Sequence, residues 1–290
     1  MGTLLRRVLL SLALLAAAAT PGAAAAAARL STSYYSRSCP RVEQIVSDVV
    51  AAKQQANPST AAGTLRLFFH DCFVSGCDAS VLVSPLSSDR TPERAAEINL
   101  SLPGDAFDAV ARAKAALEAA CPGTVSCADI LALAARDLVG ILGGPRFPVS
   151  GAHTVGFSHC SEFAHRVYNY KGKGGGASGH DPSLNPEFAR ALQSSCAGYE
   201  SNPDISIFND IVTPRDFDEL YFKNLPRGLG LLASDAALWE YPPTKVFVQQ
   251  YADNRTAFFQ DFARAMQKLG TVGVKTGRQG VVRRQCDILD

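Results

Sequence analysis

The sequence has almost no net charge, and it has no long apolar run beyond its N-terminal region. Its 28 basic and 27 acidic residues leave a net charge of +1, and it contains no dense basic run. Nucleic acids and anionic membranes are therefore poor candidate partners. After the N-terminal region, no segment reaches the roughly 18 uninterrupted apolar residues of a membrane span, so we expect no membrane partner for the mature chain.

Strand-forming segments are scarce as well. Apolar residues recur at helical spacing in four stretches, 41–55, 103–121, 127–142 and 258–269. The pair Asn57-Pro58 should end the first helix, and Ser59 and Thr60 are candidate caps for the helix that follows. The sequence thus predicts a predominantly α-helical fold.

The N-terminal region, residues 1–28, has the organisation of a secretory signal peptide. Arg6 and Arg7 precede a leucine- and alanine-rich run, and small residues suited to cleavage follow. The run that begins at Val8 is too short and too rich in alanine for a membrane span. We therefore expect an exported mature chain, residues 29–290.

Eight cysteines follow this export signal: Cys39, Cys72, Cys77, Cys121, Cys127, Cys160, Cys196 and Cys286. In an oxidising compartment, four disulfides are the natural expectation. Sequence alone leaves 105 possible pairings. Zinc is the rival use of such cysteines, but the chain has no paired Cys-x-x-Cys knuckles.

The most informative stretch runs from Thr64 to Ser80. Arg66 and His70 are four residues apart, so on a helix their side chains lie on one face, beside Phe69. The second half is rich in oxygen donors that could converge on calcium, which takes about six to eight oxygens. These donors are the carboxylates of Asp71 and Asp78, the Ser80 hydroxyl, and the carbonyls of Val74 and Gly76. The alternative is a core histidine beside a solvated acidic loop.

Written Arg-x-x-Phe-His-Asp-Cys-Phe-Val-x-Gly-Cys-Asp-Ala-Ser, this stretch resembles the distal haem segment of the secreted plant (class III) peroxidases. The stretch Ser150-Gly-Ala-His-Thr-Val-Gly156 resembles their proximal haem signature, which makes His153 the expected axial iron ligand. The resemblance implies an all-α, two-lobed haem-peroxidase fold. Haem b would lie between a distal lobe, 29–149, and a proximal lobe, 150–290.

The resemblance gives catalytic roles to three distal residues. His70 would be the proton acceptor, and Arg66 would stabilise the charge that develops in the transition state. Asn99 would accept a hydrogen bond from Nδ1–H of His70, which leaves Nε2 unprotonated and basic. Asn99 also begins an Asn-x-Ser sequon, but a pocket residue could not carry a glycan, so Asn254 is the expected glycosylation site.

The resemblance also implies two calcium ions and one disulfide pairing. Glu93 would support the first calcium together with the oxygen donors of the distal loop. The second calcium would be bound by Thr154, Asp210, Thr213, Asp216 through its carbonyl, and Asp218. The alternative for this second cluster is a solvated acidic turn. The implied disulfides are Cys39–Cys121, Cys72–Cys77, Cys127–Cys286 and Cys160–Cys196.

One stretch departs from the family. Only the five residues Pro145–Val149 stand where family members carry a longer segment, which includes the helix leading into the proximal histidine and a loop beside the aromatic-donor site. We interpret the junction between Val149 and Ser150 as a clean deletion, because all eight cysteines survive.

Other residues are interpreted as follows. The segment before the penultimate helix, in which the family has a proximal aspartate, offers only the carboxylate of Glu240. Trp239 is expected to be a packing residue and Asp129 a structural one. Three further histidines, His159, His165 and His180, are expected to be surface or structural residues. The Gly-rich run 171–179 is expected to be a flexible loop.

The expected function is reduction of hydrogen peroxide coupled to oxidation of small phenolic donors. The expected protein is a monomer secreted to the cell wall or apoplast. The alternative is a haem-poor or inactive secreted variant that keeps the disulfide and calcium scaffold, because the missing segment adjoins His153. A third interpretation, a disulfide-rich binding module, has no positive motif.

Overall fold

The computed structural model describes residues 30–87, 91–145, 153–172 and 179–289. The predicted signal peptide and the junction between Val149 and Ser150 lie outside these ranges. The chain divides into two compact units. The smaller one consists of Met1–Tyr34, described from Leu30 onward, and Lys275–Gly280, which contains the 3-10 helix η7 (Gly277–Gln279). The larger one consists of Tyr35–Val274 and Val281–Asp290 and holds all the other elements.

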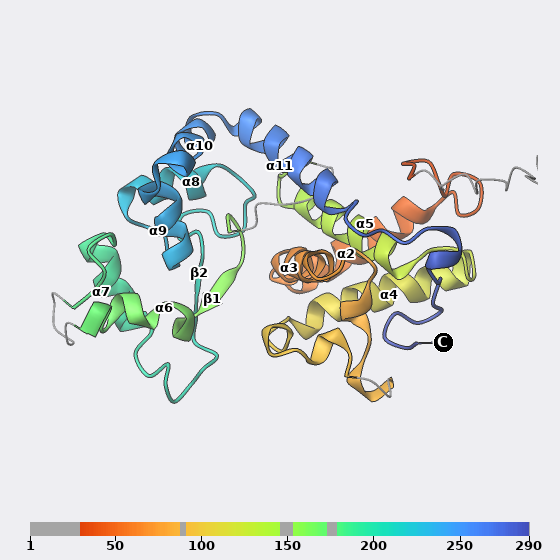
Figure 1. The fold of residues 1–290 in the computed structure, drawn as a ribbon, viewed down its shortest axis with the longest axis horizontal. Helices are drawn as coiled ribbons and strands as arrows, with labels where there is room; N and C mark the ends of the chain where they lie inside the picture. The colour runs from red at the N-terminus through yellow and green to blue at the C-terminus, as the bar shows by residue number, and fades with distance from the viewer. Residues whose placement is uncertain (1–29, 88–90, 146–152, 173–178, 290) are drawn as a thin grey trace, which may run out of the picture. The chain divides into compact units, whose positions relative to one another are not determined.

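The described part of the larger unit is predominantly helical (Figure 1), which confirms the predicted fold class. Its α-helices are α2 (Val42–Ala56), α3 (Thr60–Phe73), α4 (Gly104–Ala120), α5 (Cys127–Ile141), α6 (Cys160–Val167), α7 (Pro186–Ser195), α8 (Leu220–Asn224), α9 (Ala233–Glu240), α10 (Pro242–Asp253) and α11 (Arg255–Leu269). Its 3-10 helices are η1 (Ser80–Leu82), η2 (Pro85–Ser87), η3 (Glu93–Ala95), η4 (Glu97–Asn99), η5 (Tyr170–Gly172) and η6 (Leu225–Arg227). Strands β1 (Phe157–His159) and β2 (Ser206–Phe208) pair antiparallel, with Ser158 opposite Ile207.

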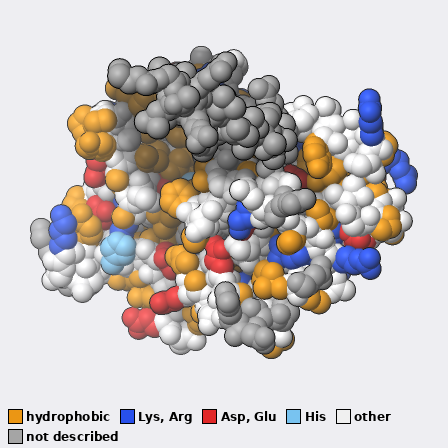
Figure 2. All heavy atoms as spheres, turned by 45° about the vertical axis from the view of Figure 1, so that its right-hand side comes forward, with side chains coloured by type: hydrophobic (Ala, Val, Ile, Leu, Met, Phe, Trp, Pro, Cys, Tyr) orange, Lys and Arg blue, Asp and Glu red, His pale blue; other side chains and the backbone are white. Residues whose placement is uncertain are grey.

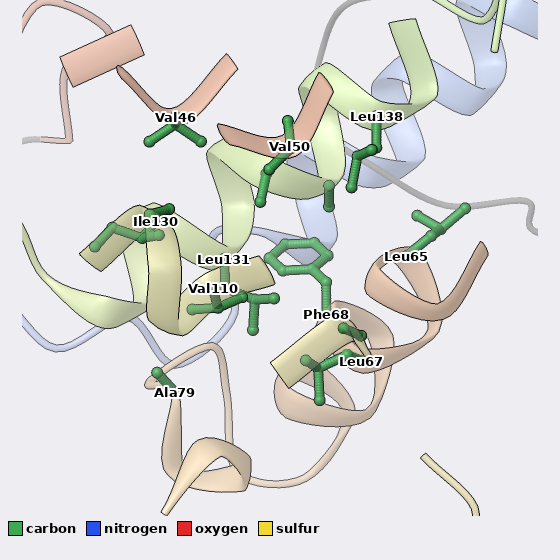
Figure 3. Packing of buried hydrophobic residues seen from close by; sticks show 14 of the residues in the cluster. Val46, Val50, Leu65, Leu67, Phe68, Ala79, Val110, Ile130, Leu131 and Leu138 are labelled. Atoms are coloured by element: carbon green, nitrogen blue, oxygen red, sulfur yellow. The ribbon is translucent and has the colours of Figure 1, made fainter. Parts of the chain in front are cut away.

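The main hydrophobic core of the larger unit lies among α2, α3, α4 and α5 (Figure 3). The ring of Phe68 points into the middle of this core and is fully buried, as are Val50 of α2 and Leu131 of α5. Three residues of α11, Phe258, Phe262 and Met266, belong to the same core. Complete burial of an apolar side chain of this size contributes about 1.5–3 kcal/mol, so the core fixes the rotation of each helix about its axis.

Helix α3 has two different faces. The residues that are not buried are Ala62, Arg66, Phe69, His70 and Phe73, and their spacing follows one side of a helix. The opposite side is buried through residues such as Leu65, Leu67 and Phe68. Packing of the apolar side therefore forces Arg66 and His70 onto the face that the core leaves uncovered.

The start of α3 differs in one detail from the sequence expectation. Ser59 occupies the N-cap position, but its side chain makes no capping hydrogen bond. Its hydroxyl instead donates to Oδ1 of Asn57, at 2.8 Å, and Thr60 donates its hydroxyl to Asp105. The side chain of Asn57 competes for the serine hydroxyl, and this local turn replaces the predicted cap.

Two smaller cores lie in the second half of the larger unit. One is formed by residues of α6 and α7 with Leu184 and Leu231, and the disulfide Cys160–Cys196 joins these two helices. The other is formed by Tyr221, Leu225 and Val248, where α8 and α9 both pack against α10. The partly buried ring of Trp239 packs against this third core, as expected for a packing residue.

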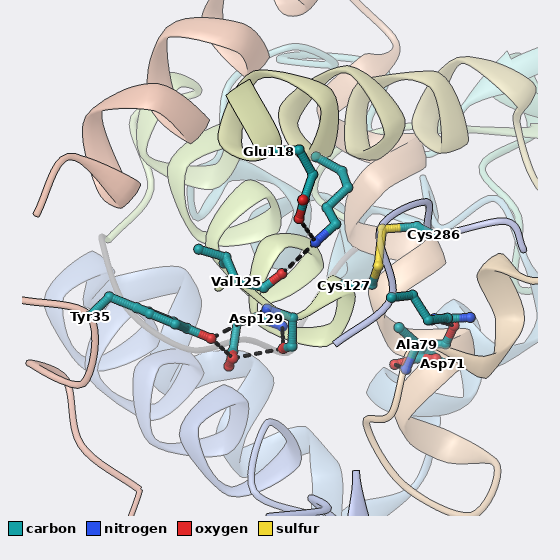
Figure 4. Close-up of a disulfide and its surroundings, with 11 residues drawn as sticks. Tyr35, Asp71, Ala79, Glu118, Val125, Cys127, Asp129 and Cys286 are labelled. Carbon is teal, nitrogen blue, oxygen red and sulfur yellow. Dashed lines mark hydrogen bonds and ion pairs between the residues drawn. A yellow bond between two sulfur atoms is a disulfide. The ribbon is translucent and has the colours of Figure 1, made fainter. Parts of the chain in front are cut away.

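Four disulfides connect all eight cysteines: Cys39–Cys121, Cys72–Cys77, Cys127–Cys286 and Cys160–Cys196. These are the pairs that the resemblance implies. Cys127–Cys286 ties the C-terminal tail to the first residue of α5 (Figure 4). Tyr35 donates to Oδ2 of Asp129 at 2.5 Å, so Asp129 anchors the chain ahead of α2, a structural role.

Neither sign of charge dominates the face in Figure 2, where Lys and Arg side chains are interspersed with Asp and Glu side chains. No helix in the described ranges combines the length and apolar character that a bilayer crossing requires.

Candidate active site

His70 lies in the last turn of α3 and is held by one amide. Its Nδ1 is 2.7 Å from Oδ1 of Asn99. Because a carbonyl oxygen only accepts hydrogen bonds, Nδ1 must carry the proton and Nε2 is left with a free lone pair. Burial, aided by the charge of Arg66, lowers the pKa of His70 below its ordinary value, although the bond to Asn99 acts in the opposite direction.

Asn99 itself is buried, and both ends of its amide are occupied. While Oδ1 accepts from His70, Nδ2 donates to the backbone carbonyl of Glu93 at 2.8 Å. This arrangement leaves no room for a glycan on Asn99. Asn254, in contrast, is exposed at the N-cap of α11, where its Oδ1 accepts from the Ala257 N–H and its Nδ2 is not needed for the cap.

Arg66 is held by a residue that the sequence did not indicate. Its Nη1 donates to the backbone carbonyl of Ser101 at 2.9 Å, and its Nη2 donates to the Ser101 hydroxyl at 2.8 Å. Ser101 is only two residues from Asn99. One short loop therefore positions both polar side chains on the uncovered face of α3.

The loop after α3 brings the predicted calcium-binding carboxylates close together. Asp71 is buried, and its Oδ2 accepts from the Ala79 N–H at 3.0 Å. Ser80 donates its hydroxyl to Oε2 of Glu93 and its N–H to Oδ1 of Asp78. Two buried oxygens, Oδ1 of Asp71 and Oε1 of Glu93, have no hydrogen-bond partner.

These carboxylates repel one another in the absence of a cation. Burial, with the charges of Asp78 and Glu93 adding to it, raises the pKa of Asp71 to about 7. Burial also raises the pKa of Glu93, and the charge of Asp78 acts in the same direction. A cation with oxygen ligands would relieve this repulsion and satisfy both unpartnered oxygens.

The curvature of this loop requires glycine at position 76. Gly76 has φ +110°, and a Cβ there would lie 2.6 Å from Cα of Gly273 and 2.8 Å from the Val272 carbonyl oxygen. No other residue fits such a close backbone approach. The loop that carries Val74 and Gly76, the two predicted carbonyl ligands, is thereby held against the segment that follows α11.

His153 is held by Asp235, a residue that the sequence analysis did not single out. Nδ1 of His153 is 2.9 Å from Oδ1 of Asp235, so the carboxylate of Glu240 is not its partner. Asp235 lies in the first turn of α9, where its Oδ2 accepts from the N–H of the N-cap residue, Leu232, at 2.8 Å. Glu240 is the last residue of the same helix, more than a turn farther along. The bond to Asp235 raises the pKa of His153.

Four of the residues predicted for the second calcium site, Thr154, Asp210, Thr213 and Asp218, contact one another through hydrogen bonds. Thr154 donates its hydroxyl to the Asp218 carbonyl at 2.9 Å, and Thr213 donates to Oδ1 of Asp218 at 3.1 Å. Oδ1 of Asp210 accepts from the N–H groups of Val212 and Thr213. Asp216 joins the turn through its N–H, which donates to the Thr213 carbonyl at 3.1 Å.

In neither loop do His, Cys, Asp and Glu side chains alone supply enough ligands for a cation. Within the described ranges, no three His, Cys, Asp or Glu side chains form a metal-binding group. Hydroxyl and carbonyl oxygens, such as those of Ser80, Thr154 and Val74, would have to complete each site. Hard cations such as calcium accept ligands of this kind.

The other histidines lie elsewhere. His159 ends strand β1 and pairs with Ser206, and His165 is exposed on α6. His180 is partly buried. Six residues of the Gly-rich run, 173–178, lie outside the described ranges.

Sequence reasoning missed three residues of this site: Asp235, Ser101 and Tyr221, which donates to Asp235 at 2.7 Å. Asp235 carried a usable signal, because an acidic residue three positions after a helix start commonly binds the N-cap N–H. Ser101 and Tyr221 act through tertiary contacts and carry no local signal.

The model of the peroxidase family matches this chain in two stretches, residues 46–150 and 148–254. The two stretches meet at Val149 and Ser150, where the resemblance places the missing segment.

Relatives from Arabidopsis thaliana align with most of the chain. It is 49% identical to Peroxidase 65 over 304 residues, covering 89% of this chain and 88% of the relative. It is 46% identical to Peroxidase 31, covering 90% and 94%, and 47% identical to Peroxidase 41, covering 89% and 90%. The 304 aligned residues exceed the 290 of this chain, so Peroxidase 65 carries residues that this chain lacks. Because the family model matches well over half of the chain and full-length relatives share nearly half of its residues, the chain belongs to the peroxidase family, in its plant class III branch, and is an oxidoreductase that acts on hydrogen peroxide with haem as its cofactor.

Proposed function

We propose that this chain is a secreted enzyme that binds haem b through His153 and couples peroxide reduction to the oxidation of phenolic donors. The observation that carries the proposal is the way in which two histidines are held. Each has Nδ1 tied to a buried acceptor, Asn99 for His70 and Asp235 for His153. Each therefore keeps Nε2 available for chemistry.

The residues around His153 fit a haem. The His153 side chain is 43% exposed, and its bond to the fully buried Asp235 commits only the Nδ1 edge. A carboxylate on the second nitrogen fixes the tautomer of a metal-binding histidine and raises its basicity. Haem, when bound, supplies the iron chemistry by which peroxide is reduced and electrons are taken from the donor.

His70 would move the proton. Its Nε2 is the free basic atom, so it would take a proton from hydrogen peroxide and return it to the departing oxygen, which leaves as water. A lowered pKa keeps the imidazole neutral and ready to accept. Arg66 would stabilise the negative charge that develops as the O–O bond breaks, and Ser101 holds its guanidinium for that task.

The chain would bind two calcium ions, one in each oxygen-rich loop. The first is supported by the two buried oxygens without partners, on Asp71 and Glu93. The second rests on the cluster around Thr154 and Asp218. The first site is linked to the distal histidine, because Asn99 binds both His70 and the Glu93 backbone.

Secretion to the cell wall or apoplast is supported by the predicted signal peptide and by four disulfides, which persist in oxidising compartments. We expect a monomer, with a glycan on the exposed Asn254.

The test is expression of the whole chain in plant cells, followed by measurement of haem absorbance and peroxide-dependent phenol oxidation. His153→Ala should lose the haem band. His70→Ala should keep it but lose about 10² to 10⁴ in turnover, the usual contribution of a general acid–base group. His165→Ala, a change at an exposed histidine, is the matched control and should resemble the parent. A His70→Ala enzyme within a few-fold of the parent would contradict the assignment.

A haem-poor secreted variant is the second candidate. It is favoured by the break in the family match at residues 148–150, close to His153. The same experiment separates the two, because this variant would be secreted and disulfide-bonded without a haem band or phenol turnover.

A further inference from the structure

The carboxylate that holds His153 is shared with a phenol. Oδ1 of Asp235 accepts from Nδ1 of His153 at 2.9 Å and from the hydroxyl of Tyr221 at 2.7 Å. Its other oxygen accepts from the Leu232 N–H at 2.8 Å. Two donors therefore compete for the electron density of one oxygen.

This arrangement is buried and fixed. Asp235 is fully buried and Tyr221 is 5% exposed, so water does not replace either donor. Tyr221 comes from α8 and Asp235 from the first turn of α9, and their helices both pack on α10. The rings of His153 and Tyr221 meet edge to face, with centroids 6.3 Å apart and planes at 88°.

The phenol is a dependable donor here. Its hydroxyl donates to Oδ1 of Asp235 at 2.7 Å in a site where both residues are buried, so this hydrogen bond does not compete with water. Among the ion pairs of the described residues, Asp235 has no Lys or Arg partner and pairs only with His153. In such a dry site, a hydrogen bond from the phenol to Oδ1 leaves that oxygen a weaker acceptor for the second donor, Nδ1 of His153.

We propose that Tyr221 is a positioning residue that limits how strongly Asp235 draws on the Nδ1 proton of His153. By occupying part of Oδ1, the phenol keeps His153 an imidazole and prevents it from acquiring imidazolate character. It thereby restrains the electron donation of His153 to iron and sets a higher reduction potential. This inference rests on the proposed function, since it takes His153 as the axial ligand.

The test compares the parent with Tyr221→Phe, which removes the hydroxyl and keeps the ring. In the haem-free chain, the Nδ1 proton of His153 should move downfield in the NMR spectrum, because its bond to Asp235 strengthens. In the haem-loaded chain, the equilibrium constant for reduction of the ferric iron should fall about tenfold, equivalent to about 59 mV for one electron. Tyr35→Phe removes the similar phenol–carboxylate bond to Asp129 and should change neither value.

A second variant gives the opposite sign and guards against loss of folding in the first. Site-specific replacement of Tyr221 by 3-fluorotyrosine makes the phenol more acidic and a stronger donor. The potential should then rise and the Nδ1 proton should move upfield.

The outcomes separate the two proposals. If the parent gains no His153-dependent haem band, the proposed function fails and this inference fails with it. If the band forms through His153 but neither Tyr221 variant shifts the potential or the Nδ1 proton, the proposed function stands and the role of Tyr221 is overturned.

Discussion

The loop that contains Asn99 and Ser101 positions two different side chains of α3. Asn99 is buried and orients His70, while Ser101 is exposed and binds Arg66 with both a backbone and a side-chain oxygen. A shift of this loop would therefore move the proposed base and the proposed cation together. Side-chain changes at Ser101 can separate the two effects, because they leave Asn99 untouched.

We expect Ser101→Ala to slow the reaction with peroxide about tenfold. The change removes one charge-assisted hydrogen bond from Arg66, and bonds of this kind contribute about 1.5–3 kcal/mol, with the low end appropriate at an exposed residue. Ser101→Thr keeps the hydroxyl and is the matched control. The measurement is the second-order rate constant with peroxide. Equal rates for the alanine and threonine variants would show that the hydroxyl does not position Arg66.

At the residue scale, a hydrogen-bond partner could be predicted from the sequence only where it lay inside a recognisable motif. The bond between His70 and Asn99 was predicted because both residues stand in motif-like segments. The partner of His153 was left open, because the segment 238–244 offered only the carboxylate of Glu240 and the capping position of Asp235 was overlooked. Burial, which makes Asp235 a committed acceptor, is not visible in sequence.

At the scale of elements, the loop between α3 and η1 donates a hydrogen bond to the buried carboxylate of Asp71, which has one oxygen without a hydrogen-bond partner. We expect chelation of calcium to lower the melting temperature of the chain, because a ligand that binds only the folded state stabilises it by about 2.7 kcal/mol at 100 times its Kd. Calorimetry with and without chelator measures the effect. Asp78→Ala should reduce the response to calcium, while Asp204→Asn, at an exposed residue, should not. A melting temperature indifferent to chelator would mark both loops as plain acidic turns.

The segment between α6 and α7 depends on a buried ion pair. Nε of Arg166 donates to Oδ2 of Asp181 at 2.8 Å, and Arg166 is 1% exposed. Burial alone would raise the pKa of Asp181, but the bonds from Arg166 and Ser183 outweigh it and hold the pKa below the ordinary value of 3.8.

This pair gives stability a defined dependence on pH. A carboxyl group whose folded pKa is depressed stabilises the protein above its unfolded pKa, and the contribution is lost as pH falls through the folded value. Asp181→Asn should therefore cost about 3 kcal/mol at pH 7, and the difference from the parent should shrink below pH 3.8. Urea unfolding with the disulfides intact measures this, with Asp204→Asn as the control. A difference that stays constant from pH 7 to pH 3 would contradict the ion-pair account.

The helices could be predicted because their apolar residues recur at helical spacing, and these are the residues that the folded core buries. The stretches 127–142 and 258–269 correspond to α5 and α11, which begin at Cys127 and Arg255. The short strands β1 and β2 were not predicted, because three residues are too few to display an alternating pattern.

At the scale of the whole molecule, we expect the segment missing between Val149 and Ser150 to limit how much of the family's activity this chain keeps. We expect insertion of a relative's segment at this junction to raise both haem occupancy and phenol turnover by about 10- to 100-fold, the usual effect of restoring support to a metal ligand. The measurements are haem absorbance per protein and turnover. A Gly/Ser insert of equal length should restore neither. Equal occupancy and turnover in the unmodified chain would show that the segment is dispensable.

The disulfide between Cys127 and Cys286 can form only late in the synthesis of the chain. The two cysteines are 159 residues apart, and at about 5–20 residues per second the second follows the first by about 8 to 30 s. Phe258, Phe262 and Met266 of α11, which complete the core around α2–α5, are also made late. During that interval the early helices are without part of their core and Cys127 is a free thiol beside earlier cysteines. Its correct partner exists only after nearly the whole chain has been made, so this bond can form only once translation is almost complete.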